Sequence, residues 1–110
     1  MKRYITILGD LISGKPASLR SSHWETVRKH FLKAHPACAA CGIVDDLQVH
    51  HIKPFHLHPE LELDTTNLVV LCENTDNNCH FVIGHHRNWK SENPNVLAEA
   101  ANKLLSRGIR

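Results

Sequence analysis

The sequence has few aromatic residues, no long apolar run and little net charge. Aromatic residues make up 5% of the 110 residues, against a hydrophobic content of 42%, so any core is thin and mostly aliphatic. No segment approaches the roughly 20 consecutive apolar residues that a membrane helix needs, so no membrane association is expected. The formal net charge of +2 is too small to identify a nucleic-acid-binding protein by itself.

The N-terminal segment has only a superficial likeness to a secretory signal. An apolar stretch follows two basic residues, but Gly9 and Asp10 interrupt it and no clear small-residue cleavage site follows. Without export, we expect a cytoplasmic protein whose thiols stay reduced, which favours metal binding over disulfides. We expect residues 1–20 to form an arm and residues 21–110 to form a single domain.

Hydrophobic patterns predict an α+β domain with a helix near each end. Ser22 and Glu25 have the spacing of a capping box, and the helix that they begin ends before Pro36. Short strands are expected at residues 47–52 and 68–71, separated by a loop, and a short helix follows the second strand. An amphipathic helix is expected over about residues 94–107. Its apolar stripe comprises Val96, Leu97, Ala100, Ala101, Leu104 and Leu105.

The four cysteines occur as two pairs. Two residues separate Cys38 from Cys41, a spacing typical of zinc knuckles, and six separate Cys72 from Cys79. Four thiolates can close a tetrahedral zinc site, and such a site would compensate for a thin core. We therefore expect one structural zinc ion per chain. Free thiols, or a redox pair at Cys38 and Cys41, are the alternatives.

Seven of the ten histidines lie between positions 50 and 86. Adjacent residues of a strand point to opposite faces, so His50 and His51 cannot both face one pocket unless the strand bends. One of them can therefore bind a metal ion while the other accepts a proton from water. That division suits phosphodiester hydrolysis, in which a metal ion neutralises developing charge and an imidazole deprotonates water.

Three ordered motifs resemble those of the HNH endonucleases. They are Val49-His50-His51-Ile52-Lys53-Pro54, Asn67-Leu68-Val69-Val70-Leu71-Cys72 and Cys79-His80. The resemblance covers about residues 36–90. It implies the small ββα-metal fold, in which a hairpin and a helix surround a catalytic divalent ion and the cysteine-bearing members add a zinc site. It also implies metal-dependent hydrolysis of DNA that leaves a 5′-phosphate.

The resemblance implies a role for each matching residue. His50 and His80 would bind the catalytic ion, which is Mg²⁺, Mn²⁺, Ni²⁺ or Zn²⁺, and His51 would be the general base. Asn67 would brace the loop between the strands. His85 is the candidate third ligand, but it follows His80 by five residues instead of the usual four, so it requires a distorted helical turn.

The insert between Cys72 and Cys79 leaves the register of His80 open. Its residues Asp76, Asn77 and Asn78 are alternative groups that would approach the ion. Trp89, a little further along the chain, is expected to cap the core.

DNA is the expected partner of this chain. Arg28, Lys29, Arg87 and Lys90 are the candidates for contacts with its backbone, which contribute affinity rather than sequence choice. The resemblance also suggests packaging or restriction partners in phages and bacteria, and the sequence does not choose between them or define an oligomeric state. The alternative function is a non-catalytic, zinc-stabilised module that binds DNA or a protein.

Overall fold

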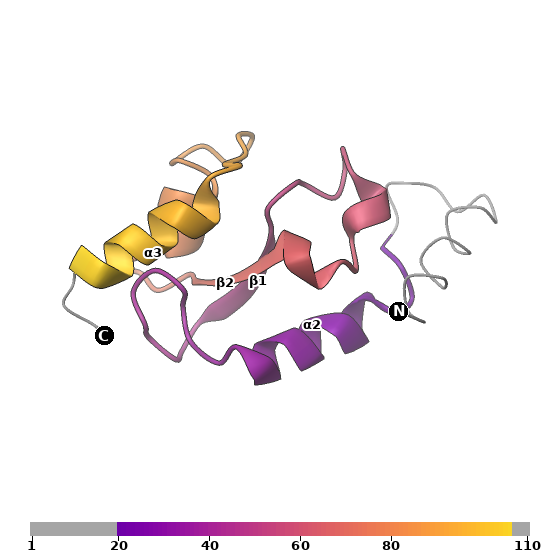
Figure 1. Cartoon of the computed structure of the whole chain (residues 1–110), viewed down its shortest axis with the longest axis horizontal. Helices are drawn as coiled ribbons and strands as arrows, with labels where there is room; N and C mark the ends of the chain where they lie inside the picture. The colour runs from indigo at the N-terminus through magenta and orange to yellow at the C-terminus, as the bar shows by residue number, and fades with distance from the viewer. Residues whose placement is uncertain (1–19, 107–110) are drawn as a thin grey trace.

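The computed structural model describes residues 20–106 and has the predicted α+β class (Figure 1). Of the predicted N-terminal arm, only Arg20 lies within the described residues. The elements follow in the order helix α2 (Trp24–Ala34), strand β1 (Leu47–His51), 3-10 helices Pro59–Leu61 and Thr65–Asn67, strand β2 (Leu68–Cys72), a π-helix (His80–Gly84) and helix α3 (Val96–Ser106).

Strands β1 and β2 form an antiparallel two-stranded sheet. The register pairs Leu47 with Cys72 and His51 with Leu68, so the strands are matched along their whole length. All five residues of β2 are buried, whereas His50 is the single buried residue of β1. The apolar run of β2 therefore forms the centre of the molecule, as expected for a strand covered on both faces.

Two small apolar clusters cover the two faces of this hairpin. On one face, Val27 of α2 packs with Leu63 and Leu68. On the other, Val69 and Leu71 of β2 pack with the cysteines, the π-helix and α3. Figure 1 shows α2 and α3 on different sides of the hairpin. Neither cluster contains more than a few large side chains, in agreement with the low aromatic content.

Helix α2 lacks the predicted capping box. It begins at Trp24, its N-cap is His23, and no side chain caps it. Glu25 instead accepts a hydrogen bond from Arg28 at 2.8 Å. The start of the helix is fixed by a tertiary contact, because the backbone N–H of Ser21 donates to both carboxylate oxygens of buried Glu62, at 3.0 and 3.2 Å.

The apolar stripe predicted for α3 is only partly buried. Val96 and Ala100 are buried, but Leu97 and Leu105 are 53% and 59% exposed, so the predicted stripe is too wide. The helix meets the core along one narrow edge and leaves the neighbouring leucines at the surface. No helix within residues 20–106 is both long enough and apolar enough to cross a membrane.

Leu71→Ala is expected to lower the free energy of unfolding by about 2–5 kcal/mol, because Leu71 is fully buried between the sheet, the π-helix and the cysteines. Urea unfolding measures the change. Leu97→Ala is the matched control, and its exposed side chain predicts a change of about 0.5 kcal/mol or less. Equal losses of unfolding free energy in the two variants would contradict the conclusion that Leu71 is in the core and Leu97 is at the surface.

Candidate metal centres and active-site cleft

The four cysteines form a buried group, called here the cysteine cluster (Cys38, Cys41, Cys72 and Cys79). Their sulfur atoms all lie within 4.8 Å of one another. The Sγ atoms of Cys41 and Cys72 are 3.6 Å apart, far longer than a disulfide bond. A tetrahedron with zinc–sulfur bonds of about 2.3 Å has sulfurs about 3.8 Å apart, so the spacing fits a metal site.

The turn from Cys38 to Gly42 presents its backbone N–H groups to a sulfur. The amides of Ala40 and Cys41 each donate to Sγ of Cys38 at 3.4 Å. Gly42 closes the turn through a 2.9 Å bond to the Cys38 carbonyl, and its φ of 82° is one that glycine adopts without strain. The glycine in the sequence thus allows the knuckle to form.

The surroundings of the cysteine cluster favour negative charge on one sulfur, that of Cys38, whereas burial raises the pKa of Cys41 and the hydrogen bond to Cys38 raises that of Cys79. A hydrogen bond from the Cys79 thiol is the main cause that lowers the pKa of Cys38 to about 4, with support from the backbone amides. The Lys103 ammonium of α3 also donates to Sγ of Cys79 at 3.3 Å. Thiolates are the form that binds metal, so this cluster could hold a structural ion.

Three histidines from distant positions form a second group, called here the histidine cluster (His50, His80 and His85). One ring nitrogen of each lies within 4.8 Å of the others. His50 comes from β1, whereas His80 begins the π-helix and His85 follows its end. A π-helix has a wider turn, with i→i+5 hydrogen bonds, so residues five apart face the same side. The distorted turn that the sequence requires for His85 is this π-helix.

Hydrogen-bond acceptors fix the tautomers of two of these rings. Nδ1 of His80 lies 2.9 Å from Oε2 of Glu73, and Nδ1 of His85 lies 2.9 Å from the carbonyl oxygen of Ser91. Because a carboxylate and a carbonyl only accept, both rings carry a proton on Nδ1 and keep a lone pair on Nε2. Two lone pairs are thus available to the histidine cluster.

His50 supplies the third ring nitrogen of the histidine cluster. Its Nδ1 lies 3.1 Å from Nε2 of His80, and its Nε2 is buried without a hydrogen-bond partner among the described residues. Burial, followed by the neighbouring imidazoles His80 and His85, lowers the pKa of His50 to about 3, which keeps the ring neutral. Neutral imidazoles are metal ligands, so the histidine cluster could bind a divalent ion.

Gly84 permits the close approach of these rings. A Cβ atom at this position would lie 3.3 Å from a carbon of each of the His50 and His80 rings, and 3.1 Å from Leu71. Asp76 of the insert, which the sequence left as an alternative ligand, is not part of the histidine cluster.

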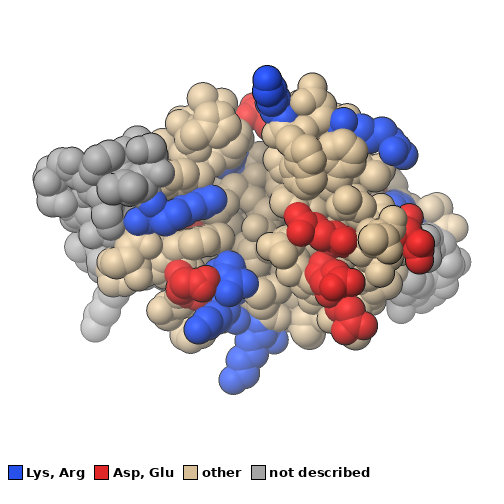
Figure 2. Space-filling model, turned by 180° about the vertical axis from the view of Figure 1, so that it is seen from behind, with Lys and Arg blue, Asp and Glu red and all other residues tan. Residues whose placement is uncertain are grey.

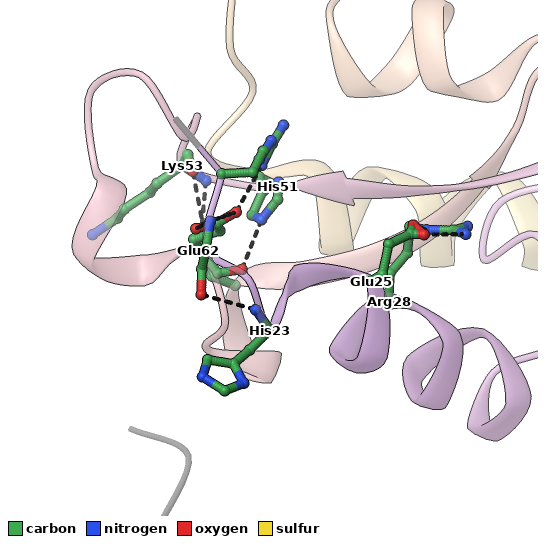
Figure 3. A network of polar contacts seen from close by, with 9 residues as sticks. His23, Glu25, Arg28, His51, Lys53 and Glu62 are labelled. Atoms are coloured by element: carbon green, nitrogen blue, oxygen red, sulfur yellow. Dashed lines mark hydrogen bonds and ion pairs between the residues drawn. The ribbon is translucent and has the colours of Figure 1, made fainter. Parts of the chain in front are cut away.

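His51 points away from the histidine cluster, as alternation along a strand requires. Its Nε2 donates to the carbonyl oxygen of Glu62 at 2.8 Å (Figure 3), and its ring stacks on Trp24 with centroids 4.6 Å apart. Donation from Nε2 leaves the lone pair on Nδ1. Burial lowers the pKa of His51 to about 4, so the ring stays neutral and able to accept a proton at neutral pH.

Asn67 fixes the backbone that follows His51. Its side-chain oxygen accepts from the Lys53 amide at 2.9 Å, and its side-chain nitrogen donates to the Lys53 carbonyl at 3.1 Å. Its own carbonyl accepts from Ile52 at 2.8 Å. These bonds join the end of β1 to the start of β2.

A cleft of about 350 Å³ brings both adjacent histidines to one surface. His50 and His51 line it together with His80 and His85. Its remaining lining includes Arg20, Phe55, Trp89 and Lys90. Side chains on opposite faces at the end of β1 therefore line the same cleft.

The four predicted DNA-binding residues are not all at this cleft. Lys90 lines it, whereas the other three do not. Arg28 lies on α2 with its guanidinium on Glu25 (Figure 3). The next residue, Lys29, is exposed. Arg87 is exposed beyond the π-helix. Figure 2 shows basic and acidic side chains interspersed on one face, so charge alone does not outline an interface.

Arg20 is a cleft residue that sequence reasoning missed. Its guanidinium lies 4.5 Å from the ring centroid of Phe55 and 3.6 Å from a carboxylate oxygen of Glu62. These partners come from the loop between the strands, so only the folded chain shows that Arg20 belongs to the site.

Trp89 lines the cleft instead of capping the core. It is 54% exposed, and its ring lies 5.2 Å from that of His80 and 4.9 Å from that of His85. The expectation of a core position is wrong, because the chain after the π-helix returns across the histidine rings.

The match to a known family covers both clusters. Residues 38–86 match the family model described as HNH endonuclease. These residues form an HNH domain. No curated protein and no solved structure matches the chain. The HNH domain extends from the first cysteine of the cysteine cluster past the last histidine of the histidine cluster, which places the domain in a nuclease family.

Gly84→Ala is expected to weaken divalent metal binding at the histidine cluster by about tenfold, the size typical of a disturbed ligand orientation. The added Cβ would lie 3.1 Å from Leu71 and 3.3 Å from the His50 and His80 rings, so these side chains would have to shift slightly. Titration with Mn²⁺ measures the affinity, and the metal content of the cysteine cluster serves as the internal control. Unchanged Mn²⁺ affinity would show that the close approach is not needed.

Proposed function

We propose that this HNH domain hydrolyses DNA phosphodiester bonds with one divalent ion held by His50, His80 and His85. The observation that carries the proposal is the position of His51. It shares a cleft with the histidine cluster, yet its ring is held separately by the Glu62 carbonyl. A proton acceptor outside the histidine cluster therefore lies beside the proposed cation site, an arrangement that suits hydrolysis of a phosphodiester.

His51 is the general base of the proposed reaction. Nδ1 takes a proton from water, while the proton on Nε2 stays on the bond to the Glu62 carbonyl, which stabilises the resulting imidazolium. Asn67 holds the backbone after His51 and so keeps the ring in place. The bound ion supplies stabilisation of the charge on the phosphate and on the departing 3′ oxygen.

Two cleft cations are the proposed contacts for the DNA backbone. Arg20 and Lys90 line the cleft, and Arg20 is held on Phe55 and Glu62. Arg28 is a less favourable candidate for a phosphate contact, because it already forms an ion pair with Glu25. Lys29 and Arg87 are exposed and would contact only DNA that extends beyond the cleft.

The two clusters call for different ions. Four thiolates suit Zn²⁺, which we propose as the structural ion of the cysteine cluster. Three imidazoles without a carboxylate ligand bind Mn²⁺, Ni²⁺ or Zn²⁺ in preference to Mg²⁺, which prefers oxygen ligands. The catalytic ion is therefore proposed to be a transition metal.

His51→Ala is expected to slow nicking of supercoiled plasmid by about 10²–10⁴-fold, the usual contribution of a general base. The assay uses a series of divalent ions with EDTA as the blank. His58→Ala is the matched control, because His58 lies in the same interstrand loop but does not line the cleft. Salt-sensitive DNA binding without metal-dependent nicking in the parent would favour a non-catalytic module. Parent-like nicking by His51→Ala would refute the base assignment.

Purified protein is expected to contain one zinc ion per chain without added metal, measured by elemental analysis. Cys72→Ser should lose this zinc and unfold at lower denaturant, because the site joins the hairpin to the chain before α3. His50→Ala is the control that should retain the zinc, since it belongs to the other cluster. Protein without zinc would rule out the structural ion.

A further inference from the structure

Glu73 is a carboxylate in hydrogen-bond contact with the histidine cluster. It is the first residue of the insert between Cys72 and Cys79. Its Oε2 lies 2.9 Å from Nδ1 of His80, and the side chains are 40% and 16% exposed. Of the three rings, His85 bonds to a neutral carbonyl and His50 faces His80, so within residues 20–106 His80 alone of the three bonds to a carboxylate.

We infer that Glu73 is a positioning residue of the histidine metal site, an inference that rests on the proposed function. Glu73 holds the Nδ1 proton of His80 and thereby directs the Nε2 lone pair toward His50 and His85. A carboxylate on the remote nitrogen also makes the ligating nitrogen more basic. Loss of such an outer partner typically costs about 10–100-fold in metal affinity.

The backbone of the insert places this carboxylate. The amide of Glu73 donates to the Asp46 carbonyl at 2.7 Å, which fixes the start of the insert. At its end, the Asn78 carbonyl accepts from the amides of Phe81 and Val82, at 3.1 and 2.9 Å, within the π-helix. Both ends of the insert are therefore anchored, and Glu73 is held against the ring that the π-helix presents.

A merely structural ion pair is the competing explanation. A protonated His80 could pair with Glu73 and hold the insert, with no effect on a metal ion. The two explanations differ in what a neutral hydrogen-bond acceptor at position 73 would do.

The test measures Mn²⁺ affinity without DNA, on zinc-loaded protein, by calorimetry and by the electron paramagnetic resonance signal of free Mn²⁺. Glu73→Ala is expected to weaken binding by about 10–100-fold. Glu73→Gln should recover most of the affinity, because its amide oxygen accepts the same proton. Asp76→Ala is the matched control: it removes a carboxylate of the same insert that is outside the histidine cluster, and should bind as the parent does.

The tautomer of His80 gives a second readout that a structural role would not move. Nitrogen-15 spectra of the parent and of Glu73→Gln should show the proton on Nδ1 of His80, and Glu73→Ala should show it redistributed to Nε2. Parent-like Mn²⁺ affinity in Glu73→Ala, or an unchanged tautomer, would overturn the inference. Neither the Mn²⁺ affinity nor the His80 tautomer depends on whether the protein hydrolyses DNA. Glu73-dependent Mn²⁺ binding without plasmid cleavage would support the inference and reject hydrolysis.

Discussion

The antiparallel register of β1 and β2 pairs His50 with Val69 and His51 with Leu68, and the positions of both histidines depend on it. His50 is turned toward the π-helix, and His51 toward Glu62 and Trp24. A slip of one residue would exchange the two faces, so His51 would face the histidine cluster and His50 would face the interstrand loop. The buried run of β2 resists such a slip, because a shift would expose apolar side chains.

The two clusters are connected through neighbouring residues of the chain. Cys72 belongs to the cysteine cluster and Glu73, next to it, contacts the histidine cluster; Cys79 and His80 repeat this arrangement. Ordering the four sulfurs therefore also positions His80 and Glu73, whose side chains are in hydrogen-bond contact. A thin core of aliphatic residues would order these side chains less firmly, so the cysteine cluster also helps to position the histidine cluster.

The spacing of short motifs predicted much of this arrangement. Both cysteine pairs meet, the adjacent histidines diverge, and the five-residue interval from His80 to His85 is accommodated by an altered helical turn. The hydrophobic periodicity of the sequence predicted burial less accurately in helices that make few contacts with the core. The wide apolar stripe of α3 is wrong because the core ends at Val96 and Ala100. The capping box of α2 is absent because the helix begins at Trp24, one residue later than expected, and Glu25 binds Arg28 instead.

The sequence by itself determined the donor atoms and the order in which the chain presents them, since thiols and imidazoles at fixed intervals limit which chemistry is available. It also determined the opposite faces of His50 and His51, because alternation is a local property of a strand. Only the tertiary structure decided which acceptor holds each imidazole proton and that Arg20 and Trp89 line the cleft. The three acceptors lie 11, 7 and 6 residues from their histidines, outside the spacing of a regular helix or strand. Their distances depend on how the hairpin, the insert and the π-helix pack together.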